Sequence, residues 1–230
     1  MYSENGINQE IRQKILSKYC DYYEVSNNYY WELEDNGTFK WGINLEIVYG
    51  NLLEFINKIA KVIENFESYN GFTTCFWDNI LNSEILFDEK DVFAKTKKRF
   101  QVPYPKNLKE NIVKRNMALL SDSIVSYDKQ IIKSVYRKDY VNINNRLTAF
   151  FASYFDIIFV INELIHPGEK PTMEICKYKC KILPNDFDKN VNKLINNGNN
   201  EIEIIETVNN IILELKRIVK YWTKAKLYFA

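Results

Sequence analysis

The sequence is poor in the residues that most often build catalytic and metal sites. It has one histidine in 230 residues, His166, which excludes acid–base catalysis by a pair of histidines. Its four cysteines form no Cys-x-x-Cys pair, whereas zinc sites usually need a tighter cluster of ligands. The sequence also has no internal repeat and no low-complexity linker. These absences argue against a zinc protein and against a repeat architecture.

The cysteines lie at Cys20, Cys75, Cys176 and Cys180. Cys176 and Cys180 are four residues apart, which places them on one face of a predicted helix. We interpret them as two half-buried thiols in a reducing compartment. A chain of this length buries roughly 70% of its unfolded surface, so it needs no disulfide to fold.

Net charge is also nearly absent. Lys and Arg number 31 and Asp and Glu number 30, which leaves a formal charge of +1. This balance favours neither nucleic-acid binding nor adsorption to a membrane surface. The basic run Lys95–Arg99 lacks the further positive charge and exposed aromatic residues of a nucleic-acid site, so we interpret it as a solvated helical face.

No apolar run is long enough for a membrane span. The longest apolar stretch, Phe150–Ile165, is short for a bilayer and contains Asp156 and Glu163. The first residues, Met1–Asn5, lack the basic start and the apolar run of a signal peptide. We therefore expect a cytoplasmic protein with no membrane association.

The first 70 residues mix helical and strand patterns. Apolar residues at helical spacing predict a helix over 8–20, with Ile11 and Ile15 in its apolar stripe. Alternating residues predict strands over 29–34 and 38–41, and the dipeptide Asn36-Gly37 predicts a hairpin turn between them.

A third strand is predicted over 44–49. Leu45, Ile47 and Tyr49 point to one side of it, and Glu46 points to the other. The strand ends at Gly50-Asn51, where Asn51 caps a helix that runs to about Glu67.

Beyond Asn70-Gly71 the pattern is almost wholly helical. Only 84–87 is predicted as a short extended piece. The predicted class is α+β, mostly α: an α/β part over 1–69, then an up-and-down helical bundle over 70–230. Its helices are predicted at 73–81, 91–100, 106–137, 140–165, 171–181, 186–196 and 201–226.

Three blocks of the sequence carry a resemblance to a known family: Ile43–Tyr49, Gly71–Asn79 and Arg146–Lys170. They resemble the minimal nucleotidyltransferases of the DNA polymerase beta superfamily, and in particular bacterial relatives of the kanamycin and lincosamide nucleotidyltransferases. The resemblance implies that 1–69 is a partial nucleotidyltransferase α/β half-domain and that the bundle binds substrate. It also implies transfer of a nucleoside monophosphate from ATP or another nucleoside triphosphate to a small hydroxylated acceptor, with Mg²⁺ as cofactor.

In that superfamily three carboxylates bind two magnesium ions, and two of them come from an Asp-x-Asp pair after a Gly-Ser turn. This sequence has no Gly-Ser dipeptide. Its only Asp-x-Asp, Asp186-Phe187-Asp188, opens a predicted helix and is interpreted as N-terminal capping. In the family the pair would lie just upstream of a segment like Tyr2–Gly6. We therefore expect this sequence to begin after the pair, and transfer to be feeble or absent.

The resemblance assigns Glu46 to the third metal carboxylate, and hence to a catalytic role. The alternative is a solvent-facing strand glutamate. Lys133 and Arg137, on the predicted helix 106–137, are candidates for binding the triphosphate. Their alternative is solvation on the helix surface.

The apolar helix 140–165 carries Asp156 and Tyr154 as candidate substrate contacts. An isolated buried carboxylate is costly, so Asp156 needs a partner or a function. The structural alternative is a pair with Arg146, a neighbouring lysine or a tyrosine. His166, Glu169 and Lys170 surround a Pro-Gly turn, which either ends the helix or borders a substrate cleft.

Thr74, Trp77 and Asp78 follow Gly71 at the predicted domain boundary, where ligands often bind. The alternative is a capped helix that packs Trp77 into the core. A second reading of the whole chain is a catalytically inactive helical module that binds a ligand or a protein. The exposed sheet edge left by the missing strands would then invite a protein partner or a dimer.

Overall fold

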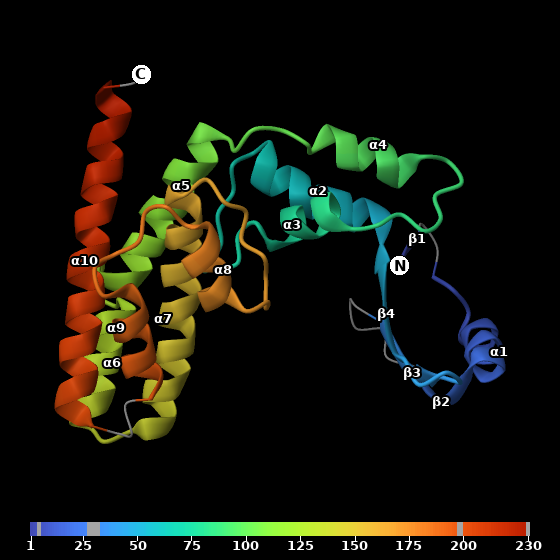
Figure 1. Ribbon diagram of the computed structural model, residues 1–230, viewed down its shortest axis with the longest axis horizontal. Coiled ribbons are helices and arrows are strands. Elements are labelled where there is room, and N and C mark those ends of the chain that lie inside the picture. Colours follow the sequence, from blue (N-terminus) through green and yellow to red (C-terminus); the bar gives the residue numbers. More distant parts are fainter. Residues whose placement is uncertain (4–5, 27–32, 197–199, 229–230) are drawn as a thin grey trace. The chain divides into compact units, whose positions relative to one another are not determined.

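The computed structural model describes residues 1–3, 6–26, 33–196 and 200–228. The chain divides into two compact units, Met1–Ala60 and Lys61–Ala230 (Figure 1). The division falls inside helix α2 (Leu52–Ile63), ahead of the boundary predicted near Tyr69. The first unit contains an antiparallel sheet and the second is helical, so the α+β, mostly α class is confirmed.

The N-terminal unit is built on three antiparallel strands: β2 (Cys20–Val25), β3 (Leu33–Phe39) and β4 (Asn44–Asn51). A two-residue strand, β1 (Tyr2–Ser3), pairs in parallel with the end of β4 and gives the order β1-β4-β3-β2. Helix α1 (Gln9–Tyr19) contacts β2. The predicted strand over 44–49 and the Asn51 cap are confirmed, because the Asn51 side chain accepts from the backbone N–H groups of Leu53 and Glu54 at 2.9 and 3.1 Å.

The predicted hairpin turn at Asn36-Gly37 is wrong, because both residues lie inside β3. The β3–β4 connection is formed by residues 40–43, where Gly42 has a φ of 84°. Gly37 lies in a tight cross-strand contact instead: a Cβ there would lie 3.1 Å from the carbonyl oxygen of Tyr22. Strand β2 was not predicted. The predicted strand residues Tyr29–Glu32 lie outside the described residues.

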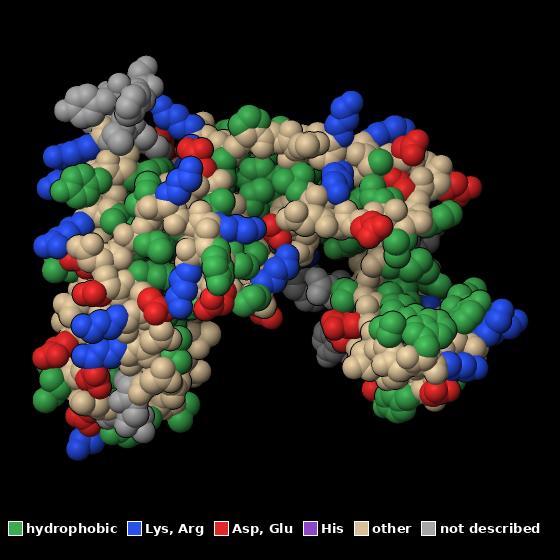
Figure 2. All heavy atoms as spheres, in the orientation of Figure 1, with side chains coloured by type: hydrophobic (Ala, Val, Ile, Leu, Met, Phe, Trp, Pro, Cys, Tyr) green, Lys and Arg blue, Asp and Glu red, His purple; other side chains and the backbone are tan. Residues whose placement is uncertain are grey.

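Helix α1 is where predicted, but its apolar stripe is not buried. Ile11 and Ile15 are 54% and 52% exposed, whereas Arg12 and Leu16 are buried. The helix presents a polar residue to its unit because Arg12 pairs with the buried Asp35. Figure 2 shows apolar side chains gathered on the surface of this unit.

The second unit is helical throughout its described residues. Helix α7 is its most buried element, with Phe150 and Ile157 fully enclosed. Helices α5 and α6 both pack against α7, and α10 packs against α6 and α9 (Figure 1). The helices are α3 (Cys75–Asn82), α4 (Val92–Arg99), α5 (Lys106–Met117), α6 (Tyr127–Tyr136), α7 (Tyr140–Ile161), α8 (Thr172–Lys179), α9 (Phe187–Ile195) and α10 (Glu201–Tyr228).

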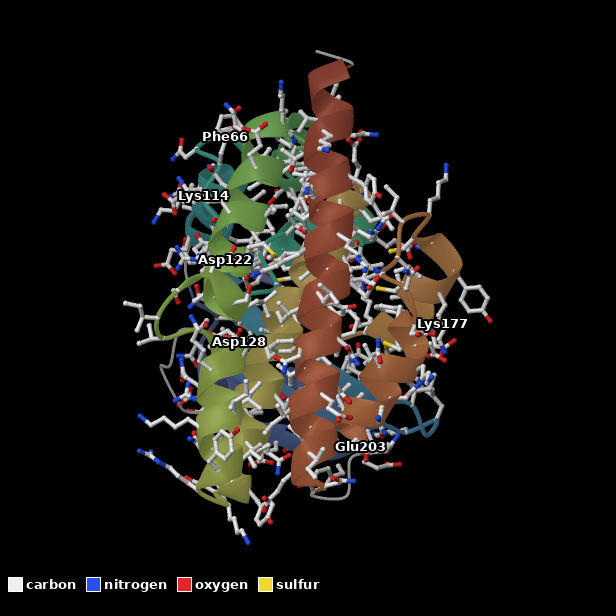
Figure 3. The ribbon with its side chains drawn as sticks, turned by 90° about the vertical axis from the view of Figure 1, so that its left-hand side faces the viewer. Phe66, Lys114, Asp122, Asp128, Lys177 and Glu203 are labelled. Carbon is white, nitrogen blue, oxygen red and sulfur yellow. The ribbon has the colours of Figure 1, made fainter. Side chains whose placement is uncertain are left out.

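The single helix predicted over 106–137 is wrong. It is interrupted by a π-helical turn, η1 (Ala118–Asp122), and by a loop that ends at Ser126, the N-cap of α6. Short polar side chains cause the break, because they bond locally instead of extending the helix. The Ser126 hydroxyl donates to the Asp128 carboxylate, and Lys216 of α10 pairs with Asp122 at 2.9 Å (Figure 3).

Two other predictions need correction. Helix α7 ends at Ile161, ahead of His166-Pro167-Gly168. There Glu163 has a left-handed φ of 55° and the Leu164 N–H donates to the Phe159 carbonyl oxygen at 2.9 Å, which closes the last turn. Residues 84–87 form no strand. No helix in the described part of the chain is both long and apolar enough to cross a bilayer.

Candidate functional site

Most of the predicted substrate residues of the helical unit meet at the N-terminal end of α3. The segment before α3 bonds to Asp156 on α7 and to His166 in the loop after α7, and α3 itself bonds to Lys170 in the same loop. Thr73 and Asp156, which meet here, are 83 residues apart in the sequence. We call this group the α3 cluster. It consists of Thr73, Thr74, Asp78, Asp156, His166 and Lys170.

Asp156 is the buried centre of the α3 cluster. Its carboxylate accepts from the Thr73 backbone N–H at 3.1 Å, from the Thr73 hydroxyl at 2.6 Å and from the Asn116 amide at 3.1 Å. All three donors are neutral groups of Thr73 and Asn116, whereas the sequence suggested a cation or a tyrosine as the partner. Burial raises the pKa of Asp156 to about 7, and the hydrogen bonds from Thr73 and Asn116 oppose that rise.

Gly71 allows this arrangement. Its φ of +88° is left-handed, and a Cβ on it would lie 2.7 Å from the backbone and the side chain of Ala152 on α7. Ala152 is one helical turn before Asp156, so the close approach at Gly71 places Thr73 beside the carboxylate.

His166 is buried between aromatic rings. Its ring centroid lies 4.8 Å from those of both Phe72 and Phe159. Its backbone N–H donates to the Thr74 hydroxyl oxygen at 2.7 Å, and its Nδ1 accepts from the Gly168 N–H at 3.1 Å. Burial lowers the pKa of His166 to about 4, although the nearby Asp78 raises it. His166 is therefore a neutral imidazole near pH 7, and it is not a helix C-cap.

The Asp78–Lys170 pair is the solvent-facing part of the cluster. Lys170 Nζ lies 2.8 Å from Asp78 Oδ2, and the side chains are 51% and 13% exposed. Asp78 also accepts from the Asn82 side chain at 2.8 Å. A partly buried acid that holds an accessible ammonium can exchange this pairing for hydrogen bonds to a polar ligand.

Trp77 packs into the core of the helical unit, as the alternative to a substrate contact predicted. Its indole N–H donates to the Phe100 carbonyl oxygen at 2.8 Å, and its ring meets Tyr104 edge-on at 5.3 Å. Tyr104 is partly buried, and its hydroxyl bonds to Thr74. Trp77 and Tyr104 thus support the α3 cluster from behind.

Tyr154 and Glu169, two further predicted substrate residues, lie outside the cluster. Tyr154 is buried among aromatic rings and stacks on Phe187 of α9 at 6.1 Å. Glu169 is exposed and has no interaction in the described residues.

Lys133 on α6 and Arg137, the C-cap of α6, lie near the first turn of α7, whereas Asp156 lies near its C-terminal end. Ser134, beside Lys133, accepts a hydrogen bond from the Asn142 amide at 2.7 Å, which places this part of α6 next to the first turn of α7. From Asn142 to Asp156 the helix rises about 21 Å. Both cations are exposed and lie far from the α3 cluster.

Glu46 lies on the exposed face of the N-terminal sheet, opposite Asn36 on β3, which in turn faces Glu24 on β2. The acid that points inward in this sheet is Asp35, which the sequence reasoning missed. Its carboxylate pairs with Arg12 of α1 and accepts from the Ser26 N–H. The Arg12 guanidinium also bonds the Ser26 and Ile7 carbonyl oxygens.

Asn116 was missed as well, although the sequence carries a signal for it. It continues the buried stripe Leu108, Ile112 of α5, where an amide in an apolar row needs partners. Its Nδ2 donates to Asp156 and to the carbonyl oxygens of Tyr69 and Ile112.

A surface groove of about 450 Å³ lies between the loop after α2 and α5. Its shape depends on Asn111, whose amide donates to the Phe66 carbonyl oxygen at 2.9 Å (Phe66 is labelled in Figure 3). None of the predicted site residues lines this groove. The lining residues are Asn65, Phe66, Glu67, Ser68, Tyr69, Asn111 and Arg115.

The described residues provide no metal site. No three His, Cys, Asp or Glu side chains among them lie close enough together to hold an ion. Glu46 therefore belongs to no group of three such side chains in this part of the chain, and Mg²⁺ binding there would be weak because magnesium needs several oxygen ligands.

Comparisons with protein-family models and with curated protein sequences found no match for this chain. The resemblance to nucleotidyltransferases therefore remains a prediction.

Proposed function

We propose that this chain is a nucleotidyltransferase-like protein whose helical unit binds a small hydroxylated acceptor at the α3 cluster. The related enzymes move a nucleoside monophosphate from a nucleoside triphosphate to such an acceptor. In this chain the transfer is feeble or absent, because two of the three metal carboxylates expected from the resemblance have no counterpart in its sequence.

The observation that carries the proposal is the assembly of the α3 cluster. Thr74, Asp78 and Lys170 were selected from the sequence as substrate residues. Two separate bonds, from the His166 N–H to Thr74 and between Lys170 and Asp78, join the start of α3 to the loop after α7. The pairing of Asp78 with an accessible Lys170 offers both an acceptor and a donor to ligand hydroxyls. Asp156 and Thr73 hold this surface from the interior.

Nucleotide binding tests the transferase half of the proposal. We expect weak heat in calorimetry of the full chain with millimolar ATP and Mg²⁺, and Glu46→Gln should remove its Mg²⁺-dependent part. Glu34→Gln is the matched control, because Glu34 is another exposed strand glutamate on the same sheet face. Absence of heat at millimolar nucleotide would remove nucleotide recognition from the proposal, and an unchanged Glu46→Gln variant would remove the role of Glu46.

Acceptor binding tests the other half. A panel of small hydroxylated compounds should include one that raises the melting temperature of the chain, and Lys170→Ala should abolish that rise. Lys177→Ala is the control, because Lys177 forms a comparable exposed pair with Asp188 at 2.7 Å on the outside of α8 (Figure 3). Equal losses in both variants would place the acceptor elsewhere.

A second candidate is a catalytically inactive helical module that acts by binding a ligand or a protein. The lack of a metal-binding group in the described residues favours it. In the N-terminal unit β2 is an edge strand of the described sheet, which provides a surface for a protein partner or a dimer. A chain that binds an acceptor but neither ATP nor Mg²⁺ would support this candidate over the first.

A further inference from the structure

The last turn of α8 brings two thiols together. The N–H of Cys180 donates to the Cys176 carbonyl oxygen at 2.9 Å, so Cys180 closes the final helical turn as its C-cap. The Cys176 side chain is fully buried and that of Cys180 is partly exposed. The Cys176 thiol donates a hydrogen bond to the Cys180 sulfur. One thiol of the pair is thus reachable from solvent and the other stands directly behind it.

The two thiols differ in how readily they lose a proton. The hydrogen bond from Cys176 lowers the pKa of Cys180, and the same bond together with burial raises the pKa of Cys176. Cys75 is also partly exposed, but burial raises its pKa.

We propose that Cys176 and Cys180 form a peroxide-responsive pair, in which Cys180 is the reactive thiol and Cys176 resolves it as a reversible disulfide. The Cys180 thiolate attacks one oxygen of a hydroperoxide, which forms an S–O bond, breaks the O–O bond and yields sulfenic acid with hydroxide or alkoxide as leaving group. The Cys176 sulfur then attacks the Cys180 sulfur. An S–S bond forms, the S–O bond breaks, and the Cys176 proton leaves with the hydroxyl as water.

Helix geometry makes this disulfide possible but strained. Residues four apart in a helix have Cα atoms about 6 Å apart, which lies inside the range of disulfides. Their Cβ atoms, about 5–6 Å apart, must approach to about 4 Å, so the last turn of α8 has to deform. Cys180 can move because its ψ of 126° already leaves the helix. A strained disulfide is easily reduced, which suits a reversible modification.

The test uses the full chain, fully reduced and then exposed to limiting hydrogen peroxide. Differential alkylation and peptide mass spectrometry follow each cysteine. The pKa of Cys180 is lowered and that of Cys75 is raised, so we expect Cys180 to be modified several-fold faster than Cys75. The product should be a Cys176–Cys180 link that dithiothreitol reverses completely.

Variants separate the two roles. Cys180→Ser should remove the fast reaction, and Cys176→Ser should leave a sulfenic acid on Cys180 that dimedone traps. Cys75→Ser is the control and should leave the fast reaction unchanged. If Cys176→Ser prevents folding, the relative oxidation rates and the disulfide product in the unmodified chain still test the proposal. Oxidation of Cys75 as fast as Cys180, or conversion of Cys180 to sulfinic acid without a link to Cys176, would overturn the proposal.

Discussion

Each of the two units of this protein encloses a carboxylate at its centre, Asp35 in one and Asp156 in the other, and they stabilise it in different ways. In the N-terminal unit Asp35 is wholly enclosed and is paired with the Arg12 guanidinium. In the helical unit Asp156 is 2% exposed and is surrounded by neutral donors from Thr73 and Asn116. The first carboxylate is compensated by a charge, and the second only by dipoles.

The neutral surroundings of Asp156 affect its protonation near neutral pH. A nearby cation favours the charged form of a carboxylate, whereas burial without a cation disfavours it. Asp156, with a pKa raised to about 7 by burial, lies in the range where a site can respond to its environment. Asp35 instead links α1 to the sheet. The predictions below are ordered from the largest expected effect to the smallest.

Arg12→Met tests the charge compensation in the N-terminal unit. The variant leaves the Asp35 charge buried and unpaired, which typically costs about 3–5 kcal/mol in the free energy of unfolding. Hydrogen exchange in β2 and β3 measures the loss locally. The double variant Arg12→Met/Asp35→Leu should recover most of it, because no charge remains inside. A loss in Arg12→Met below about 1 kcal/mol would contradict the assigned role.

Gly71→Ala tests the close approach that positions Asp156. A left-handed φ and a Cβ placed 2.7 Å from Ala152 together should cost roughly 2–4 kcal/mol by denaturant unfolding. Gly42→Ala, in the hairpin of the N-terminal unit, separates the two contributions, since Gly42 has a φ of +84° and open space around it. The two variants should differ by the steric contribution alone, so equal losses would show that Ala152 yields freely.

Asp156→Asn tests the uncompensated carboxylate. Burial raises the pKa of Asp156 from 3.8 to about 7, so its contribution to stability is fully present below about pH 4 and is lost as the pH rises through 7. The variant does not titrate, so its stability relative to the unmodified chain should rise by about 3 kcal/mol between pH 5 and pH 8. Exposed Glu84→Gln should show no such trend. Parallel pH profiles for Asp156→Asn and the unmodified chain would refute the shift.

His166→Gln tests the opposite dependence in the same cluster. Burial lowers the pKa of His166 from 6.5 to about 4, so the unfolded chain takes up a proton that the folded chain resists. The unmodified chain therefore loses stability as the pH falls from about 6.5 to 4. The variant, which keeps an acceptor for the Gly168 N–H, should gain about 2 kcal/mol relative to it between pH 7 and pH 5. Thermal unfolding at both pH values measures this, and a constant difference would count against a buried neutral imidazole.

Local patterns in the sequence predicted the elements well where one period dominated. The strand over 44–49 alternates, and the helices around Phe150 and Ile204 have long apolar stripes, so each was found near its place. The hairpin at Asn36-Gly37 was misplaced because this glycine lies inside β3 in close contact with β2, and the dipeptide alone does not distinguish such a position from a turn. Helix α1 was predicted from an apolar stripe that in the structure is exposed. The pairing of Arg12 with Asp35 decided which face of the helix turned inward.

The residues of the candidate site were chosen one at a time, and their contacts could not be predicted. Asp156 was conspicuous because it is an acid in an apolar helix, but its partners Thr73 and Asn116 come from positions 83 and 40 residues away. Lys133 and Arg137 seemed equally plausible in the sequence, yet the rise along α7 separates them from the cluster.

The sequence alone thus determined the mostly helical α+β class, the main helices and the need of Asp156 for a partner, because periodicity and the cost of burying charge act locally. Only the tertiary structure decided which carboxylate received a cation, which face of α1 was buried and which polar residues met at α3. Those outcomes depend on contacts between distant segments, and no local pattern encodes the distance between them.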